Sequence, residues 1–481
     1  MNRDAMMPRM MLGRSTMSAI VLGTLMACGG ARPSASPGRE PSPAPAQVPA
    51  GAPDAARRPA GAPSLELDQA RLYQQMGFLA RGAPMPFIGT ISFLASGKDS
   101  THVLFAVSLA NAALTFGREN DRFRAGYSVT IALKAGGATV KESESHESVL
   151  VASYKETMRI DESVIYQDIV TAKPGRYELV VTVRDDGSSR ASTEDVTVNI
   201  PALGPGAHGL STPVSFARVA PRSSLDSLPN MVANPQSSAT FGRDSVIGLY
   251  LEGYDGANAP RLPLAVSVVT DQGARLFADT ISLPRHGALY SGVVYLKASR
   301  IGIGPATISF SRPGTADTVK AAFFIGFGED MPVASFTEMV DYLRWFAAPS
   351  HLKSLRDTAP EFRAGAWAAF IKSTTNAAGI NDAMHDYFRR LIDANRRFAE
   401  EGTPGWKTDR GKVLLGLGDP DAVYEQQQSA ATIGQRGRNQ IWEYRAYNLQ
   451  LVFYDQSGYG RWRLTNSSDL AFTATWRRHV Q

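Results

Sequence analysis

The chain has 481 residues, 43% of them hydrophobic, and a formal net charge of +5. This length predicts several domains, and the apolar fraction is enough for more than one packed core. Lysine and arginine are scattered without a basic run, which argues against nucleic acid as a partner. The single cysteine excludes a disulfide within the chain.

The first residues have the features of a secretory signal. Three arginines precede an apolar run over residues 17–27 that is too short to span a bilayer. The run ends in the letters LMAC at Cys28, which resemble the bacterial lipobox, where the cysteine is lipidated and the chain is cut in front of it. We expect a lipoprotein signal peptide over 1–27, lipid attachment at Cys28, and a protein exported to the bacterial cell envelope and anchored to a membrane there. The alternative is an ordinary signal peptide with an incidental cysteine.

The segment 28–64 predicts a tether. Residues 31–64 contain nine prolines among alanine, serine and glycine, a composition that cannot bury a core. As extended polyproline helix, at about 3.1 Å per residue, such a segment would reach on the order of 100 Å. We therefore expect a disordered stalk between the lipid and the folded part of the chain.

Residues 65–201 predict a helix followed by a β-sandwich. Apolar residues recur at helical spacing over 65–82, up to Gly82. The period then changes to two, and about seven strands over about 115 residues suit an antiparallel sandwich. Pro174-Gly175-Arg176-Tyr177 resembles the tyrosine corner of immunoglobulin-like domains, in which the hydroxyl bonds to backbone across the corner.

Residues 202–330 predict a second β-sandwich. Clear strands begin at 245 and 264, and the strands over 306–310 and 320–325 close the unit as a pair. The ending repeats that of the first unit, with a Gly/Pro turn, a strand, a polar loop and a final strand. The long polar stretch over 221–242 predicts a loop that runs over the surface.

Residues 331–481 predict an α+β domain, and this region contains all six tryptophans. The predicted fold class is thus mainly β with α+β: two tandem immunoglobulin-like β-sandwiches, then a C-terminal domain of helices followed by an antiparallel meander. Helical patterns come first, and strands joined by a glycine hairpin loop over 455–460 follow. The expected helices cover 335–347, 360–373 and 381–401, and the expected strands 412–415, 440–445, 450–454 and 461–464.

One motif in this last region resembles a known family. Gly405-Trp406-Lys407-Thr408-Asp409 matches the pentapeptide of the GWxTD-domain family, bacterial exported proteins named after it. The run Arg410-Gly411-Lys412, the run Gly418-Asp419-Pro420-Asp421 and the run Ile441-Trp442-Glu443-Tyr444 also fit the family over about 335–465. The family has no established reaction, so the resemblance implies a domain class and no mechanism.

The pentapeptide has the physical features of a structural corner. Gly405 could adopt backbone angles closed to other residues and so turn the chain sharply out of the preceding helix. Trp406 would then fold its ring onto the helix face of Phe398 and Leu391. Asn395, a polar residue on the same apolar stripe, needs partners if it is buried and would hold the corner from below.

The polar residues of the motif have two interpretations. Thr408 and Asp409 are short side chains that cap turns by bonding nearby N–H groups, and Arg410 could pair with Asp409, Asp421 or Glu443. Alternatively, the polar residues form a ligand site beside an exposed tryptophan, able to hold a glycan or a peptide. The candidate cluster, structural or ligand-binding, comprises Trp406, Thr408, Asp409, Arg410, Asp421 and Trp442.

The sequence contains no recognisable catalytic set. Zinc-helix, nucleophile-elbow, dinucleotide and phosphate-loop motifs are absent, and we expect neither a metal nor a cofactor. The expected function is a lipid-anchored envelope protein that binds an envelope protein or a glycan without catalysis. The alternative is an envelope hydrolase acting on glycan or peptide through Trp406, Asp409 and Asp421, with the two carboxylates as acid and base.

Overall fold

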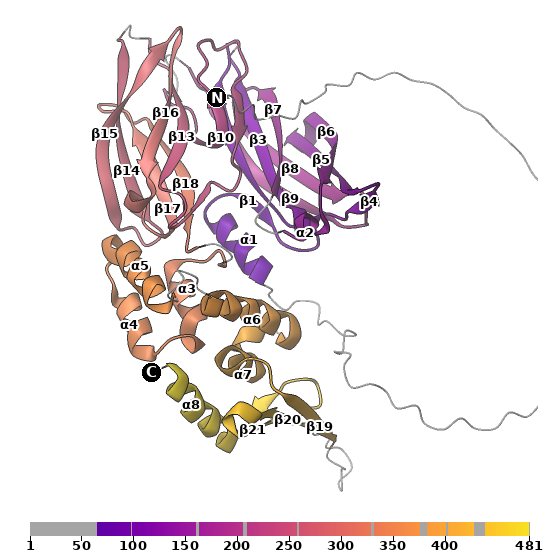
Figure 1. Ribbon diagram of the computed structural model, residues 1–481. Helices are drawn as coiled ribbons and strands as arrows, with labels where there is room; N and C mark the ends of the chain where they lie inside the picture. Colours follow the sequence, from indigo (N-terminus) through magenta and orange to yellow (C-terminus); the bar gives the residue numbers. More distant parts are fainter. Residues whose placement is uncertain are drawn as a thin grey trace, which may run out of the picture. The chain divides into compact units, whose positions relative to one another are not determined.

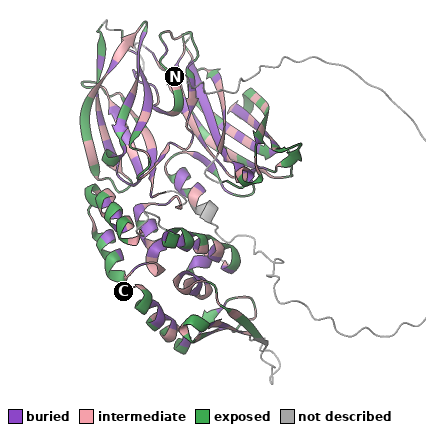
Figure 2. Ribbon diagram, in the orientation of Figure 1, coloured by how far each residue is buried: buried purple, intermediate pink, exposed green. Residues whose placement is uncertain are grey.

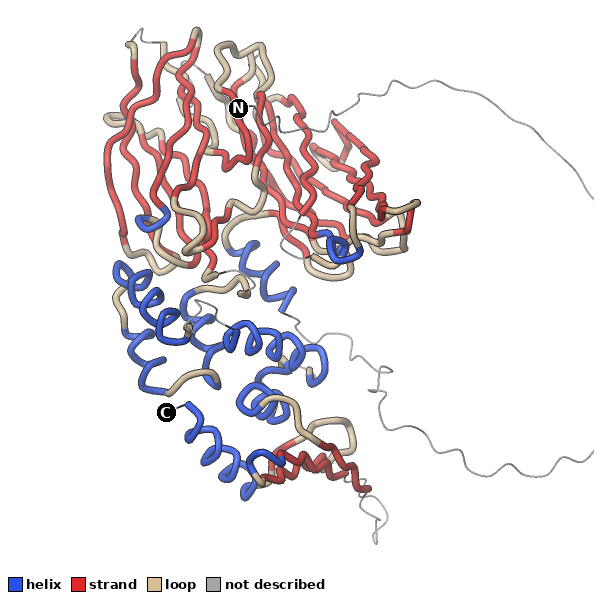
Figure 3. Tube along the Cα trace, in the orientation of Figure 1, coloured by secondary structure: helices blue, strands red, loops and turns tan. Residues whose placement is uncertain are grey.

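The computed structural model describes residues 65–97, 99–159, 163–204, 209–256, 259–328, 331–375, 382–400, 403–427 and 438–480. The predicted signal peptide, Cys28 and the tether over 28–64 lie outside these residues. The described residues belong to one compact unit. Its strands precede most of its helices along the chain, as Figures 1 and 3 show. In the described part, no helix has the length and apolar character needed to cross a lipid bilayer.

The first helix is shorter than the sequence pattern predicts. Helix α1 (Leu65–Gln75) ends before Gly77, whose φ of +89° a side chain would strain. Strand β1 (Leu79–Arg81) then pairs antiparallel with the next strand, so Leu79 lies on a sheet and not on the helix. The prediction of a helix over 65–82 is therefore wrong after Gln75, because sheet pairing overrides the helical spacing of Leu79.

The first sandwich consists of two antiparallel sheets that enclose one apolar core. Residues from both sheets meet in that core, and Figure 2 shows buried residues alternating along the strands. One sheet has the order β1-β2-β3-β7; in the other, β4-β5-β8-β9, strand β6 pairs with β5. The remaining bounds are β2 (Phe87–Ala95), β3 (Thr101–Ala110), β4 (Gly117–Glu119), β5 (Arg122–Ala135), β6 (Ala138–Val151), β7 (Ser163–Ala172), β8 (Gly175–Asp185), β9 (Ala191–Ile200) and the short helix α2 (Tyr154–Thr157).

The predicted tyrosine corner is present at the start of β8. The Tyr177 hydroxyl donates a 3.0 Å hydrogen bond to the carbonyl oxygen of Lys173, four residues upstream. At the other end of the strand, Asp185 begins the hairpin turn to β9 and accepts hydrogen bonds from Thr115 and Ser188. Both ends of β8 are thus fixed by side-chain bonds to neighbouring segments.

The second sandwich is a nine-stranded sheet that folds over itself. Its order is β11-β10-β13-β16-β15-β14-β17-β18-β12. Strand β15 pairs with β14 over most of its length and with β16 at its end, so it passes from one layer to the other. The bounds are β10 (Val214–Ala220), β11 (Asn230–Ala233), β12 (Ser238–Thr240), β13 (Val246–Gly253), β14 (Arg261–Thr270), β15 (Arg275–His286), β16 (Leu289–Lys297), β17 (Gly304–Ser311) and β18 (Thr318–Gly326).

The segment over 221–242 is only in part the surface loop that its polar composition predicts, since residues 223–228 are irregular and mostly exposed but later residues form strands. It contributes β11 and β12 to the sheet, and β12 pairs in parallel with β18. Arg222, near its start, is buried with 5% exposure. The prediction therefore holds for 223–228 and is wrong for the two strands and for Arg222, whose charge is satisfied by buried partners.

The C-terminal region has helices followed by a small antiparallel sheet, as predicted, and the predicted fold class is confirmed. Residues 412–415, however, belong to a helix and not to a strand, and two helices over 349–357 and 466–480 were not predicted. The sheet order is β19-β20-β21-β22. The elements are α3 (Phe336–Tyr342), η3 (Leu343–Trp345), α4 (Pro349–Asp357), α5 (Arg363–Thr374), α6 (Asp382–Phe398), η5 (Gly405–Lys407), α7 (Asp409–Leu417), β19 (Ala422–Gln427), β20 (Arg438–Tyr444), β21 (Leu449–Asp455), β22 (Arg463–Leu464) and α8 (Asn466–Val480).

The apolar core of the second sandwich continues into the C-terminal helices. Just after β18, the ring of Phe327 lies 5.0 Å edge-on from the ring of Trp367 on α5. The indole of Trp367 donates a 2.8 Å hydrogen bond to the Phe327 carbonyl oxygen. On the other side, Tyr73 of α1 packs against Phe324 of β18. The last strand of the sandwich therefore forms a common support for α1 and α5.

Candidate functional site

The motif residues 404–411, which we call the GWxTD corner, lie where α6, η5 and α7 meet. The backbones of these elements approach so closely that a side chain at Gly405 or at Gly411 would collide with a neighbouring segment. A Cβ at Gly405 would lie 1.9 Å from the carbonyl oxygen of Ala394 on α6, and one at Gly411 would lie 1.9 Å from the Gly405 carbonyl oxygen. Gly405 is not among the glycines with positive φ. The prediction that it supplies an unusual backbone angle is therefore wrong, and close packing is the reason for glycine here.

Trp406 is buried at the corner, with 3% of its surface exposed. Its backbone N–H donates a 3.2 Å hydrogen bond to the Asn395 side-chain oxygen, so Asn395 holds the corner as predicted. The ring lies 5.2 Å edge-on from Tyr342, and the guanidinium of Arg344 lies 4.6 Å from the ring centre. Trp406 thus fixes the corner to α3 and η3, two elements that the sequence did not place near it.

Thr408 and Asp409 use their side chains to fix backbone. The Thr408 hydroxyl accepts a 3.1 Å hydrogen bond from the Gly411 N–H, which caps α7, and donates a 2.7 Å hydrogen bond to the Gly405 carbonyl. The Asp409 carboxylate accepts a 2.8 Å hydrogen bond from the backbone N–H of Leu464. The capping prediction for Thr408 is confirmed, and Asp409 links α7 to β22.

Arg410 lies between aromatic rings and forms no ion pair within the part of the chain that the structure describes. Its guanidinium is 4.8 Å from the ring centre of Phe398 and 5.3 Å from that of Trp462. Its Nε is buried without a hydrogen-bond acceptor, and burial lowers the pKa of Arg410 to about 10. The predicted pairing with Asp409, Asp421 or Glu443 is wrong, since none of these carboxylates bonds to it in the described residues.

Asp421 and Trp442 belong to the sheet and not to the corner. The Asp421 carboxylate accepts a 2.6 Å hydrogen bond from the backbone N–H of Arg445, next to the end of β20. Trp442 is 2% exposed, and its indole donates a 2.9 Å hydrogen bond to the side chain of Gln440. The structure therefore brings Trp406, Thr408 and Asp409 together at the corner, while Asp421 and Trp442 stabilise a different element.

Sequence analysis missed a buried ionic cluster, which we call the Arg222 cluster: Ala95, Arg222, Tyr250, Glu252 and Tyr254. The Arg222 guanidinium donates 2.6 and 2.8 Å hydrogen bonds to the Glu252 carboxylate. It also donates a 2.5 Å hydrogen bond to the carbonyl oxygen of Ala95, which lies on β2 of the first sandwich. Both tyrosine hydroxyls donate to the same carboxylate, at 2.7 and 2.6 Å. The cluster therefore connects the two sandwiches.

Glu252 was the one sequence signal that could have revealed this cluster. It occupies the otherwise apolar strand β13 two residues after Tyr250, so the two side chains lie on the same face. A carboxylate on a buried strand face requires a cationic or hydrogen-bonding partner. The partner comes from a polar segment thirty residues earlier, and sequence spacing could not identify it.

Comparison with known proteins identifies the C-terminal third of the chain. Residues 315–478 match the family model described as the GWxTD domain. The match begins before residue 331 and so includes β18, in keeping with the apolar core that β18 shares with the helices. No curated protein matches the chain.

Solved structures resemble only part of the chain, and weakly. One is a biofilm-associated protein BSP domain, 9% identical, covering 53% of this chain and 54% of that one with a TM-score of 0.17. Another is dimeric latent PorU from Porphyromonas gingivalis, 11% identical, covering 49% of this chain and 20% of that one with a TM-score of 0.22. The chain therefore matches about half or less of the length of these structures. On the evidence of the family match, residues 315–478 of this chain are similar to the GWxTD domain.

Proposed function

We propose that this protein is a lipid-anchored component of the bacterial cell envelope that binds an envelope protein or a glycan and catalyses no reaction. The signal-like start, the lipobox at Cys28 and the proline-rich tether support the location. Two tandem sandwiches followed by a compact helical domain support a binding or scaffold role, because such modules present large surfaces at a distance from the membrane.

The observation that supports the absence of catalysis is how the motif carboxylates are used. Asp409 and Asp421 each accept a hydrogen bond from a backbone N–H, of Leu464 and of Arg445 respectively. General acid–base work needs a carboxyl group within reach of the substrate proton. A carboxylate that positions backbone contributes to stability instead. The hydrolase alternative also requires an accessible ring at Trp406, which is buried.

Two substitutions at Asp409 separate the two interpretations. Asp409→Asn keeps an oxygen that can accept from the Leu464 N–H, whereas Asp409→Ala removes it. If the residue is structural, Asp409→Ala lowers the free energy of unfolding by about 1–3 kcal/mol, the cost of an unsatisfied buried group, and Asp409→Asn costs less. Both are measured by urea unfolding of the full chain. Equal stability of all three proteins, with hydrolysis of envelope glycan by the wild type alone, would establish the hydrolase instead.

The anchor and the partner need separate experiments. Cys28→Ser should move the protein from the membrane fraction to the soluble fraction, and unchanged membrane association would refute lipid attachment. Crosslinking in intact cells followed by pull-down should recover one envelope partner, with crosslinks on residues 65–480. Recovery of lipid alone with the wild-type protein would contradict the binding role.

A further inference from the structure

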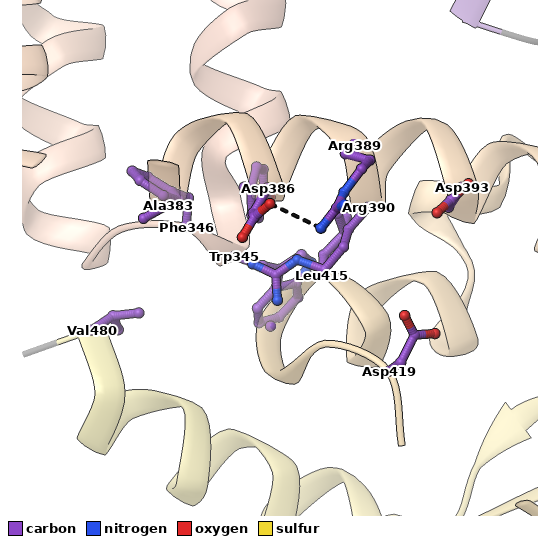
Figure 4. A pocket seen from close by; sticks show the side chains of 12 residues that line it. Trp345, Phe346, Ala383, Asp386, Arg389, Arg390, Asp393, Leu415, Asp419 and Val480 are labelled. Atoms are coloured by element: carbon purple, nitrogen blue, oxygen red, sulfur yellow. Dashed lines mark hydrogen bonds and ion pairs between the residues drawn. The ribbon is translucent and has the colours of Figure 1, made fainter. Parts of the chain in front are cut away.

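A cavity of about 660 Å³ lies among η3, α6, α7 and the end of α8. Figure 4 labels the apolar side chains of its lining: Trp345 of η3, Phe346 directly after it, Leu415 of α7 and Val480 of α8. Its volume is in the range of small-molecule sites, and its lining combines aromatic and aliphatic side chains with five charged ones. The GWxTD corner does not line it, so the cavity is a separate feature of the same domain.

The charged groups at this cavity leave one cation without a partner. Three carboxylates line it, and each pairs with an arginine: Asp386 with Arg389, Asp393 with Arg396 and Asp419 with Arg397. The fourth guanidinium, that of Arg390, pairs with no carboxylate in the described residues, and its Nε is buried without an acceptor. Arg396 and Arg397 lie outside the lining, so the lining itself has three carboxylates and two guanidinium groups, and Arg390 is the lining arginine that forms no ion pair among the described residues.

Arg390 lies next to aromatic surface. In Figure 4 its side chain extends from α6 into the cavity, while a dashed line joins Arg389 to Asp386. The Arg390 guanidinium is 6.0 Å from the ring centre of Tyr387. Trp345 and Phe346 are only half-buried, so their rings are available to a bound group. A planar guanidinium presents paired donors that match the two oxygens of a carboxylate.

The geometry points to a binding site for a carboxylate attached to an apolar or aromatic group, held by Arg390 and by the rings of Trp345 and Phe346. A single free cation matches one negative charge, which favours a carboxylate over a phosphate dianion. Histidine, cysteine, serine and threonine are absent from the cavity lining, and each of its three aspartates pairs with an arginine, so we infer binding of the ligand without a reaction. This inference rests on the proposed binding role and gives it a ligand class, either a free acid or the C-terminal residue of a peptide.

Ligand-observed NMR titration of the full chain tests the site. The probe is 3-phenylpropionate, with 3-phenylpropanamide as the uncharged control. We expect a Kd on the order of 1 mM for the acid, given the affinity that so few atoms can supply, and at least tenfold weaker binding of the amide. Arg390→Gln should weaken acid binding at least tenfold, whereas Arg356→Gln, an exposed arginine outside the cavity, should leave it unchanged.

A second variant covers the possibility that Arg390→Gln disturbs the domain. Ala383 is exposed at the rim of the cavity, so Ala383→Trp should fill the space and abolish binding without changing the melting temperature. Equal affinity of wild type and Arg390→Gln, or no saturation at 20 mM, would overturn the inference.

The peptide Ala-Ala-Phe, with a free or an amidated C-terminus, distinguishes the two sources of the carboxylate. Tighter binding of the free peptide than of 3-phenylpropionate identifies a peptide end, and binding of the acid alone identifies a small molecule. The pull-down in cells can succeed when this titration fails, which would leave the binding role intact and refute only the cavity.

Discussion

Two arginines in this protein, Arg222 (buried) and Arg410 (partly buried), have opposite surroundings. Arg222, between the sandwiches, donates to Glu252, Ala95, Ser227 and Leu225, so that each of its guanidinium nitrogens has an acceptor. Arg410, at the GWxTD corner, has an unbonded Nε, lies between two aromatic rings and forms no ion pair among the described residues. Burial opposes the charge of Arg222, but its bonds to Glu252 raise its pKa above the usual value, whereas burial lowers the pKa of Arg410 to about 10.

This comparison shows that different interactions stabilise the Arg222 cluster and the GWxTD corner. The Arg222 cluster depends on an ion pair buried within the second sandwich, where removing one member leaves the other charge buried and unpaired. Its link to the first sandwich is the hydrogen bond from Arg222 to the Ala95 carbonyl oxygen. The GWxTD corner depends on close backbone packing at Gly405 and Gly411 and on the cap at Thr408. Its arginine fills space between rings. Mutations at the two sites should therefore differ in size and in cause.

Arg222→Met should have the largest effect. It leaves the Glu252 carboxylate buried without its cation, and breaking a buried pair in this way costs about 3–5 kcal/mol of unfolding free energy. Urea unfolding followed by far-UV circular dichroism measures it, because the sandwiches contain no tryptophan. The double variant Arg222→Met/Glu252→Gln removes both charges and should recover part of the loss. A cost below 1 kcal/mol for the single variant would show that the pair is not needed.

Gly405→Ala should be next in size. The added methyl would lie 1.9 Å from the Ala394 carbonyl oxygen, so α6 and η5 must separate, at a cost of about 1–3 kcal/mol or more. Tryptophan fluorescence during urea unfolding reports on this region. Gly365→Ala on α5 is the matched control, because nothing lies within 4 Å of its added methyl. The control should stabilise by about 0.5–1 kcal/mol, and similar results for both glycines would refute the close-packing argument.

The Arg222 cluster also predicts a pH dependence through His102, whose Nδ1 lies 2.9 Å from the Thr171 hydroxyl. Burial, and then the charge of Arg222, lower the pKa of His102 below 6.5, against the opposing charge of Glu252. Below pH 6.5 the unfolded chain therefore binds a proton that the folded chain does not. The resulting stability is present above pH 6.5 and is lost as the pH falls.

The melting temperature at pH 7.5 and pH 5.5 measures this loss. Wild type should lose more than His102→Gln, which cannot titrate. A parallel fall in the two proteins would show that His102 does not contribute.

Sequence patterns predicted the features that depend on local chemistry. Alternation identified the strands, and the Pro-Gly-Arg-Tyr run identified the bond from Tyr177 to Lys173. Helix α7 was missed because Val413-Leu414-Leu415 is a short apolar run that fits a strand equally well. Thr408, an N-cap residue directly before the first residue of α7, would have favoured a helix over a strand. Features that depend on tertiary contacts were not predictable. Arg222 pairs with Glu252, thirty residues later in the sequence, and Trp406 packs against Tyr342 on α3.

Arg410→Met should have the smallest effect and tests the comparison most directly. Methionine keeps a long apolar side chain between Phe398 and Trp462 and removes a partly buried charge that has no ion-pair partner among the described residues. We expect the free energy of unfolding to change by no more than about 1 kcal/mol in either direction, because replacing a desolvated charge by an apolar side chain of similar volume is often neutral or favourable. Arg410→Ala, which leaves a gap between the rings, should cost more. If Arg410→Met instead costs as much as Arg222→Met, the guanidinium must have an anionic partner in solution, and the two arginines would then be alike.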